Sequence, residues 1–151
     1  MKRLICMAGL FVLAMGFAQN RPVVPPAEVS AAFEKEFPKM KPAWSQEYVG
    51  ADRSEVRYEA QFSSNDVNKV AAFDKLGNLK AVETAVQLGQ LPPNAFHYIR
   101  KKFSFETIKE ASKVVDSNKQ TTYEVGMETN GKFYVLVFDK DGNFLQQTEK
   151  D

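Results

Sequence analysis

Cysteine and histidine are almost absent from this chain. Its 151 residues include one cysteine, Cys6, and one histidine, His97. A single cysteine cannot form a disulfide within the chain, and a lone histidine has no spaced partner for a metal site or a catalytic triad. His97 is therefore interpreted as a helix-surface residue. We predict no catalytic residue, no metal site and no cofactor, and hence that the protein is not an enzyme.

An excess of charge of either sign is also missing. The 20 basic residues nearly balance the 19 acidic ones, and no basic stripe runs along the sequence. Nucleic acids and anionic membranes bind proteins through such stripes, so neither is expected as a partner. The core must come from apolar residues instead, and twelve Phe and five Tyr supply much of the area to bury.

The chain has one long hydrophobic run, at residues 4–17, directly after Lys2 and Arg3. A transmembrane helix needs about 20 apolar residues, so this run is too short to span a bilayer. Charged residues, an apolar run and small residues before a polar break are typical of a secretory signal peptide. We predict that residues 1–18 are removed after Ala18, which leaves a periplasmic or secreted protein with no membrane attachment. Lipidation of Cys6 is disfavoured because almost no apolar residue precedes it.

A turn motif occurs twice, as Phe-Asp-Lys-Leu-Gly-Asn at residues 73–78 and Phe-Asp-Lys-Asp-Gly-Asn at residues 138–143. Each copy lies between apolar alternating runs, and its order suits a hairpin turn with the glycine at positive φ. The second copy could also suggest a calcium loop. It lacks the spacing and the closing glutamate of an EF-hand, so the turn is preferred.

Two matching sets of elements surround these turns. A helix is predicted from the Pro-Pro pair at 25–26 to Pro38, and another after the Pro-Pro pair at 92–93. Alternating runs predict strands near residues 43–49, 55–63, 68–74 and 78–86, then near 107–115, 120–128, 132–139 and 143–148. Such short connections require antiparallel pairing. The predicted fold class is α+β, a tandem duplication of a helix plus a four-stranded antiparallel meander at residues 19–89 and 90–151, with the helices on one face of the sheet.

One strand in each half is apolar on both faces, unlike its neighbours. In the strand at residues 55–63, charged Arg57 and Glu59 alternate with apolar residues and predict a solvated face. If Phe73 and Phe138 point at the helices, other apolar residues must lie on the helix-free face, either covered or as an exposed patch. We predict that this face binds a partner through five of them: Val70, Ala72, Phe133, Val135 and Val137. Trp44 and Tyr48 are further candidates, although a Trp directly after a helix more often packs in the core.

The order of these motifs resembles a known family. A signal peptide, the Pro-x-x-Val-x-x-x-Phe-x-x-x-Phe-Pro motif at residues 26–38, Trp44, Tyr-Glu-x-x-Phe at residues 58–62, Phe-Asp-Lys-x-Gly and a second round are similar to the secreted PepSY-like proteins of the Bacteroidetes type. That family is related in fold to the beta-lactamase inhibitor protein. The resemblance implies a periplasmic tandem domain whose sheet carries helices on one face and leaves the other open for protein contact.

The predicted function is a non-enzymatic, periplasmic protein-binding or inhibitor-like module that acts through the helix-free face of its sheet on an unidentified protein or peptide. The alternative is a small-ligand or lipid-binding protein with an apolar pocket between the two repeats. Paired carboxylates such as Glu34 with Glu36, or Asp74 with Asp139, are interpreted as solvated groups. No desolvated acidic cleft is expected.

Overall fold

A computed structural model describes residues 23–50, 52 and 54–150. The predicted signal peptide and its cleavage after Ala18 lie outside these residues. Within the described residues, two α-helices, two short 3-10 helices and eight strands follow one another. Their bounds are α1 Ala27–Glu36, β1 Ala43–Val49, β2 Glu55–Ser64, β3 Val67–Asp74, β4 Leu79–Ala85, η1 Leu88–Gln90, α2 Pro93–Lys102, η2 Phe105–Thr107, β5 Ile108–Asp116, β6 Thr121–Thr129, β7 Lys132–Asp139 and β8 Phe144–Lys150.

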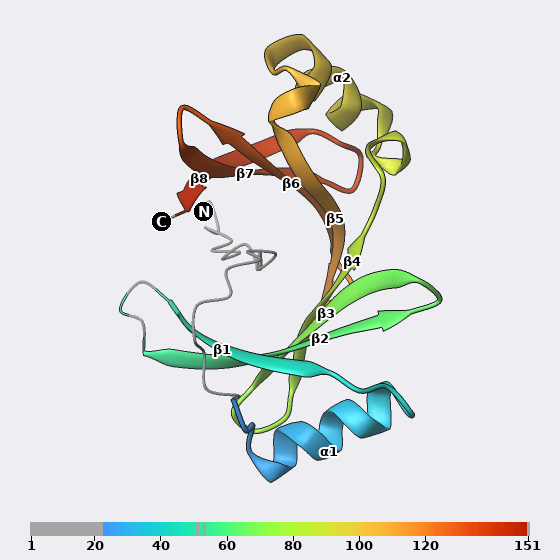
Figure 1. Cartoon of the computed structure of the whole chain (residues 1–151), viewed down its shortest axis with the longest axis vertical. Helices are drawn as coiled ribbons and strands as arrows, with labels where there is room; N and C mark the ends of the chain where they lie inside the picture. The colour runs from blue at the N-terminus through green and yellow to red at the C-terminus, as the bar shows by residue number, and fades with distance from the viewer. Residues whose placement is uncertain (1–22, 51, 53, 151) are drawn as a thin grey trace.

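The strands form one sheet in which every strand pairs antiparallel with the next, in the order β1 to β8. The sheet curves strongly, and both helices lie on its convex side (Figure 1). β1 and β8 are the two edges and lie across the concavity from each other. The concave side carries no helix of the described chain.

The predicted fold class is wrong in its division of the strands. We expected an α+β fold of two helix-plus-meander units with four strands each. The register shows that β4 pairs directly with β5, from Ala81 opposite Asp116 to Ala85 opposite Ser112, so the second set of strands extends the first sheet. The fold is therefore mostly β, with α2 inserted between two adjacent strands of one eight-stranded sheet.

A proline lies at or directly before the first residue of each helix, and each helix buries one narrow face. Pro26 precedes α1, and Pro93 is the first residue of α2, where the missing N–H costs no intrahelical hydrogen bond. Val29 and Phe33 are the buried positions of α1, and Ile99 is buried in α2. The spacing of four residues places Val29 and Phe33 on one side of the helix, toward the sheet.

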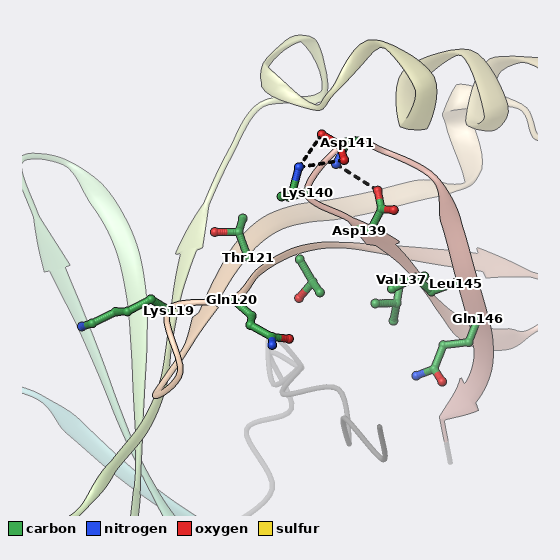
Figure 2. A pocket seen from close by; sticks show the side chains of 10 residues that line it. Lys119, Gln120, Thr121, Val137, Asp139, Lys140, Asp141, Leu145 and Gln146 are labelled. Carbon is green, nitrogen blue, oxygen red and sulfur yellow. Dashed lines mark hydrogen bonds and ion pairs between the residues drawn. The ribbon is translucent and has the colours of Figure 1, made fainter. Parts of the chain in front are cut away.

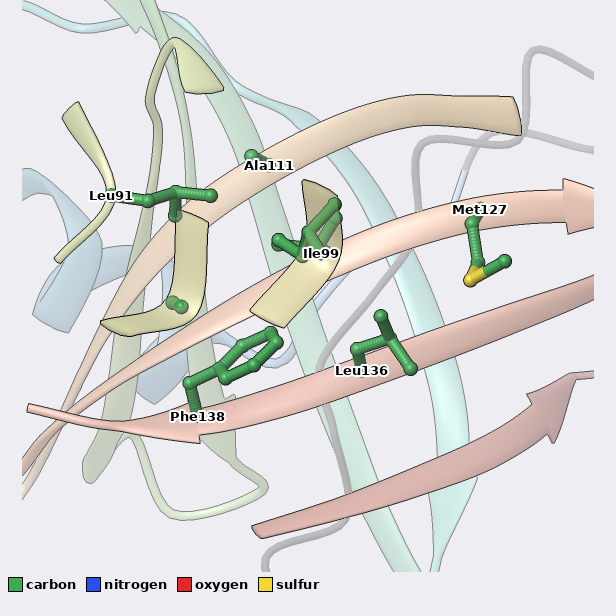
Figure 3. Close-up of a cluster of buried hydrophobic side chains, with 8 residues drawn as sticks. Leu91, Ile99, Ala111, Met127, Leu136 and Phe138 are labelled. Atoms are coloured by element: carbon green, nitrogen blue, oxygen red, sulfur yellow. The ribbon is translucent and has the colours of Figure 1, made fainter. Parts of the chain in front are cut away.

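The convex side holds two apolar clusters, one under each helix. Under α1, Phe33 makes edge contacts with Trp44, Phe62 and Phe73, at ring-centroid distances of 5.5, 5.2 and 6.4 Å. Under α2, the cluster joins residues from the helix and from β5, β6 and β7 (Figure 3): Leu91, Ala95, Ile99, Ala111, Val125, Met127, Leu136 and Phe138. Most of the apolar stabilisation of the fold therefore lies between the helices and the convex side.

The two Phe-Asp-Lys-x-Gly-Asn turns join β3 to β4 and β7 to β8. Gly77 and Gly142 have φ angles of 80° and 83°, which confirms the predicted positive φ. In the second turn, one oxygen of Asp139 accepts hydrogen bonds from the backbone N–H groups of Asp141 and Asn143, at 2.9 and 2.8 Å. Asp74 does the same in the first turn. The aspartate thus fixes each turn by satisfying its backbone donors.

Candidate functional site

The concave side of the sheet carries the five apolar residues predicted to bind a partner. The register puts Val70 and Ala72 of β3 on the face opposite Phe73, which packs under α1. Likewise Phe133, Val135 and Val137 of β7 lie opposite Phe138, which packs under α2. All are buried except Phe133, which is half-buried. Their placement on the helix-free face is as expected, and their contact with a partner stays a prediction.

The two aromatic candidates of β1 are placed differently. Trp44 lies on the convex side, where it packs against Phe33 and Phe73. It is therefore part of the core under α1 and not of the concave face. Tyr48 lies four residues after Trp44, on the same side of β1, which is an edge strand of the sheet. It is 58% exposed. The structure does not bring these two aromatic side chains together with the five apolar residues.

Three glutamates that the sequence interpretation did not select lie in the middle of the concave face. Glu59 of β2 stands opposite Ala72, Glu83 of β4 opposite Val70 and Val114, and Glu124 of β6 opposite Val137. Their exposed fractions are 1%, 4% and 1%. The expectation of a solvated face at Glu59 and of no desolvated acidic cleft is therefore wrong.

Each of these glutamates has one carboxylate oxygen without a hydrogen-bond partner. The atoms are Oε1 of Glu59, Oε2 of Glu83 and Oε2 of Glu124. The other oxygen of Glu59 accepts a hydrogen bond from the hydroxyl of Ser45 at 3.2 Å. A buried polar group left unsatisfied costs about 1–3 kcal/mol, and more when it is charged. Three such groups on one face are a considerable cost, and all three lie where the sheet has no helix.

The environment disfavours the ionised form of these side chains. Burial, followed by the charge of Glu124, raises the pKa of Glu83 to about 8. Burial and then the charge of Glu47 raise the pKa of Glu59 to about 7. Burial raises the pKa of Glu124 to about 7. It also raises the pKa of Glu110 to about 7, and Glu110 lies near the start of β5 on the same face. The concave face therefore changes charge near neutral pH.

Two hollows adjoin this face. The larger has a volume of about 710 Å³ and lies between the β5–β6 turn and the β7–β8 turn, with Thr122, Val137 and Gln146 among its walls (Figure 2). The smaller, of about 340 Å³, spans the boundary between the two halves of the chain, and Gln61, Asn68 and Ser112 are among its lining residues. Apolar side chains, Phe62 and Val70 among them, also line this second hollow, and the apolar ligand pocket predicted between the repeats stays a prediction.

The described residues include no cluster of three or more His, Cys, Asp or Glu side chains positioned to hold a metal ion. His97 is exposed on α2, in line with its interpretation as a helix-surface residue. Within the same part of the chain, no helix has both the length and the apolar character needed to cross a bilayer.

Comparison with known families identifies the chain. The family model described as "Putative beta-lactamase-inhibitor-like, PepSY-like" matches residues 56–146, which is more than half of the sequence. The chain belongs to the PepSY-like family. This confirms the resemblance inferred from the order of its motifs. Among curated proteins, no sequence matches this PepSY-like chain.

Solved structures share the fold at low sequence identity. A protein described as one of the "putative periplasmic proteins" of Bacteroides eggerthii has a TM-score of 0.70 and 20% identity, with 84% of this PepSY-like chain and 90% of that chain covered. A DUF2874 family protein from Bacteroides ovatus has a TM-score of 0.66 and 22% identity, covering 84% and 89%. A BLIP-like protein from Bacteroides fragilis has a TM-score of 0.59 and 22% identity, covering 84% and 87%. At these identities the likeness establishes the fold of the PepSY-like chain and not its partner.

The sequence contained one signal for the glutamates that were missed. Tyr-Glu occurs at residues 58–59 and again at residues 123–124, in matching strands of the two halves. In both strands the tyrosine faces the helices and the glutamate faces the concavity. The alternation of a single strand cannot distinguish a solvated face from a buried concave one, so the burial of these glutamates in the PepSY-like chain is shown only by the three-dimensional structure.

Proposed function

We propose that this protein is a non-enzymatic periplasmic binding or inhibitor-like module that holds another protein against the concave face of its sheet. The observation that carries the proposal is the set of unsatisfied carboxylate oxygens of Glu59, Glu83 and Glu124, buried on the one face that no described helix covers. Buried acceptors without donors are rare in folded proteins, and a bound partner that supplies the donors explains them.

The apolar residues of the same face support a protein partner. Val70 and Ala72 of β3 lie between the strands of Glu59 and Glu83, and Val135 and Val137 of β7 lie on the strand next to that of Glu124. Protein interfaces combine an apolar centre with a limited number of polar contacts. The concave face has both features and lies on a curved sheet of eight strands. Such a face fits a protruding part of another protein better than it fits a flat one.

Family and sequence support the compartment and the class of activity. The family description names beta-lactamase-inhibitor-like proteins, and one similar structure is described as a periplasmic protein. The signal peptide predicted at residues 1–18 agrees with export. A binding protein also needs none of the catalytic groups that the sequence lacks.

Substitution of Phe133 tests the proposal. Phe133→Ala removes an aromatic side chain from the concave face, and its loss is expected to weaken partner binding by about 1–3 kcal/mol, as for typical interface anchors. The control is Leu76→Asp, a change at an exposed turn position whose counterpart in the second turn is already Asp141. The immobilised variants are incubated with periplasmic extract of the producing organism, and the captured proteins are quantified by mass spectrometry against wild type.

Val135→Asp distinguishes an interface from internal packing. If the concave face is a binding surface, a variant that stays folded loses the captured protein, while Leu76→Asp retains it. If Phe133→Ala and Val135→Asp both retain the captured proteins at the wild-type level, the concave face is not the binding surface. Circular dichroism melts run beside the capture assay separate lost binding from lost folding.

A further inference from the structure

The three buried glutamates occupy alternate strands of the sheet. Glu59 lies on β2, Glu83 on β4 and Glu124 on β6. Strands two apart in a sheet are separated by roughly 10 Å, so the carboxylates form a row across the concavity. The row is electrostatically connected, because the charge of Glu124 raises the pKa of Glu83, and that of Glu59 does so to a smaller extent.

The described cations that act on this row do not offset the effect of burial. Arg57 and Lys150 favour ionisation of Glu59, and Lys150 favours ionisation of Glu124, yet both carboxyls keep a raised pKa. The ion pair of Arg57 found between described residues is with Glu55, at 3.9 Å, and not with one of the three glutamates. One oxygen of each glutamate thus has no hydrogen-bond donor, and a partner that binds there can supply one.

The chemistry of the row decides the kind of donor. An ionised carboxylate can only accept hydrogen bonds, and a cationic donor makes both the hydrogen bond and the charge favourable. A metal ion is disfavoured because no cluster of three acidic or histidine side chains with suitable geometry occurs in the described residues. An anionic ligand would be repelled. Side-chain guanidinium and ammonium groups remain, and guanidinium suits buried ion pairs because it is weakly hydrated and donates in a planar fork.

We propose that the concave face recognises a segment of a partner protein that presents arginine or lysine side chains between apolar ones, with the cations directed at Glu83 and Glu124 and the apolar groups at Val70 and Val137. This rests on the proposed function and adds the chemistry of the partner. Val70 stands opposite Glu83, and Val137 opposite Glu124, so alternating cationic and apolar side chains match the alternation of the face. Charge complementarity of this kind gives specificity as well as attraction.

Binding of such a segment must displace protons. With pKa values of about 8 for Glu83 and about 7 for Glu124, a large share of these carboxyls is protonated at pH 6. A bound cation favours the ionised form, so each glutamate that it engages releases its proton. The affinity is therefore expected to increase with pH between 6 and 8.5.

Two peptides test the proposal on the purified protein. The probe is acetylated and amidated Val-Arg-Val-Arg-Val. Its matched control carries citrulline, which keeps the shape of arginine but has a carbonyl oxygen in place of one NH2 group and no charge. Binding is followed by NMR, through the side-chain carboxyl resonances of the glutamates and the backbone amides. At pH 8.5 we expect the arginine peptide to bind at least tenfold more tightly than the citrulline peptide, and the ratio to fall several-fold at pH 6.

Two protein variants localise the effect. Glu83→Gln combined with Glu124→Gln is expected to remove the preference for arginine, whereas Glu34→Gln, an exposed position on α1 at the opposite side, leaves it unchanged. Equal affinity for the two peptides, an unchanged preference in the double variant, no binding of either peptide, or saturation by calcium chloride alone would each overturn the cationic partner. The proposed function fails separately, when the Phe133 and Val135 variants retain their captured protein.

Discussion

Raising the pH from 5 to 8.5 is expected to destabilise this protein. Glu83, Glu59 and Glu124 have pKa values of about 8, 7 and 7 in the folded chain, compared with 4.5 for an unperturbed glutamate. The folded state therefore binds more protons than the unfolded state, so stability falls as the pH rises. The stabilisation is fully present below about pH 4.5 and is lost as the pH passes through 7 to 8. Glu83 alone contributes on the order of 3–5 kcal/mol to this loss.

Urea unfolding at pH 5, 6.5 and 8.5 measures the effect directly. Glu83→Gln keeps the shape of the side chain but cannot ionise, so this variant is expected to show a much weaker decline between pH 6.5 and 8.5. Glu128→Gln is the control, because Glu128 lies on the same strand as Glu124 but is exposed and paired with Lys109 at 3.7 Å. A free energy of unfolding that stays constant or rises across this range in the wild type would contradict the burial of ionisable groups on the concave face.

The positions of the strands could be predicted from the sequence because their determinants are local. The runs predicted at residues 43–49 and 132–139 coincide with β1 and β7, and the other six strands differ from their predicted bounds by a few residues at most. Asn130-Gly131, a dipeptide typical of two-residue hairpin turns, connects β6 to β7 with φ angles of 52° and 71°. Turn residues and side-chain alternation act over a few positions, so a single sequence contains this information.

The continuity of the sheet could not be predicted in the same way. Whether β4 pairs with β5 or ends a separate sheet depends on contacts across the connection that contains α2. Val82 opposite Val115 and Ala81 opposite Asp116 are ordinary strand pairs with no distinguishing sequence signal. The twofold recurrence of motifs predicts two four-stranded meanders and leaves open whether their sheets join, and the register between β4 and β5 shows that one sheet is formed.

The apolar residues of the candidate site were predicted from the sequence, whereas its three buried glutamates were not. An apolar residue on a face without a helix is conspicuous, as Val135 and Val137 are in a strand that does not alternate. A glutamate on that face does not stand out, because a charged residue that alternates with apolar ones is normally expected to be exposed to solvent. Glu59 and Glu124 are buried because the sheet curves around them, and curvature is a property of all eight strands together.

Gly142→Ala is expected to be among the most destabilising single substitutions in the turns of the fold. A Cβ atom at this position would lie 2.6 Å from the backbone nitrogen of Ala95 and 2.8 Å from the Cβ of Pro92. The turn is also tied to α2 by the side-chain amide of Asn94, which donates to the carbonyl of Asp141 at 3.1 Å. Backbone strain at positive φ costs about 1–3 kcal/mol and overpacking about 1–3 kcal/mol, so we expect a loss of about 3–5 kcal/mol in the free energy of unfolding.

Gly131→Ala separates the cost of backbone strain from the cost of overpacking. Gly131 has a similar φ of 71°, but a Cβ there would meet no atom within 4 Å, so this variant reports the backbone strain alone. Gly77→Ala should resemble Gly142→Ala, because its Cβ would lie 2.6 Å from the carbonyl oxygen of Glu28 in the first turn of α1. Denaturation midpoints of the three variants measure the difference. Equal losses of stability in all three variants would mean that the close contacts of Gly77 and Gly142 with the helices do not contribute to the cost. The helices would then be held on the convex side by the packing of Phe33 and Ile99.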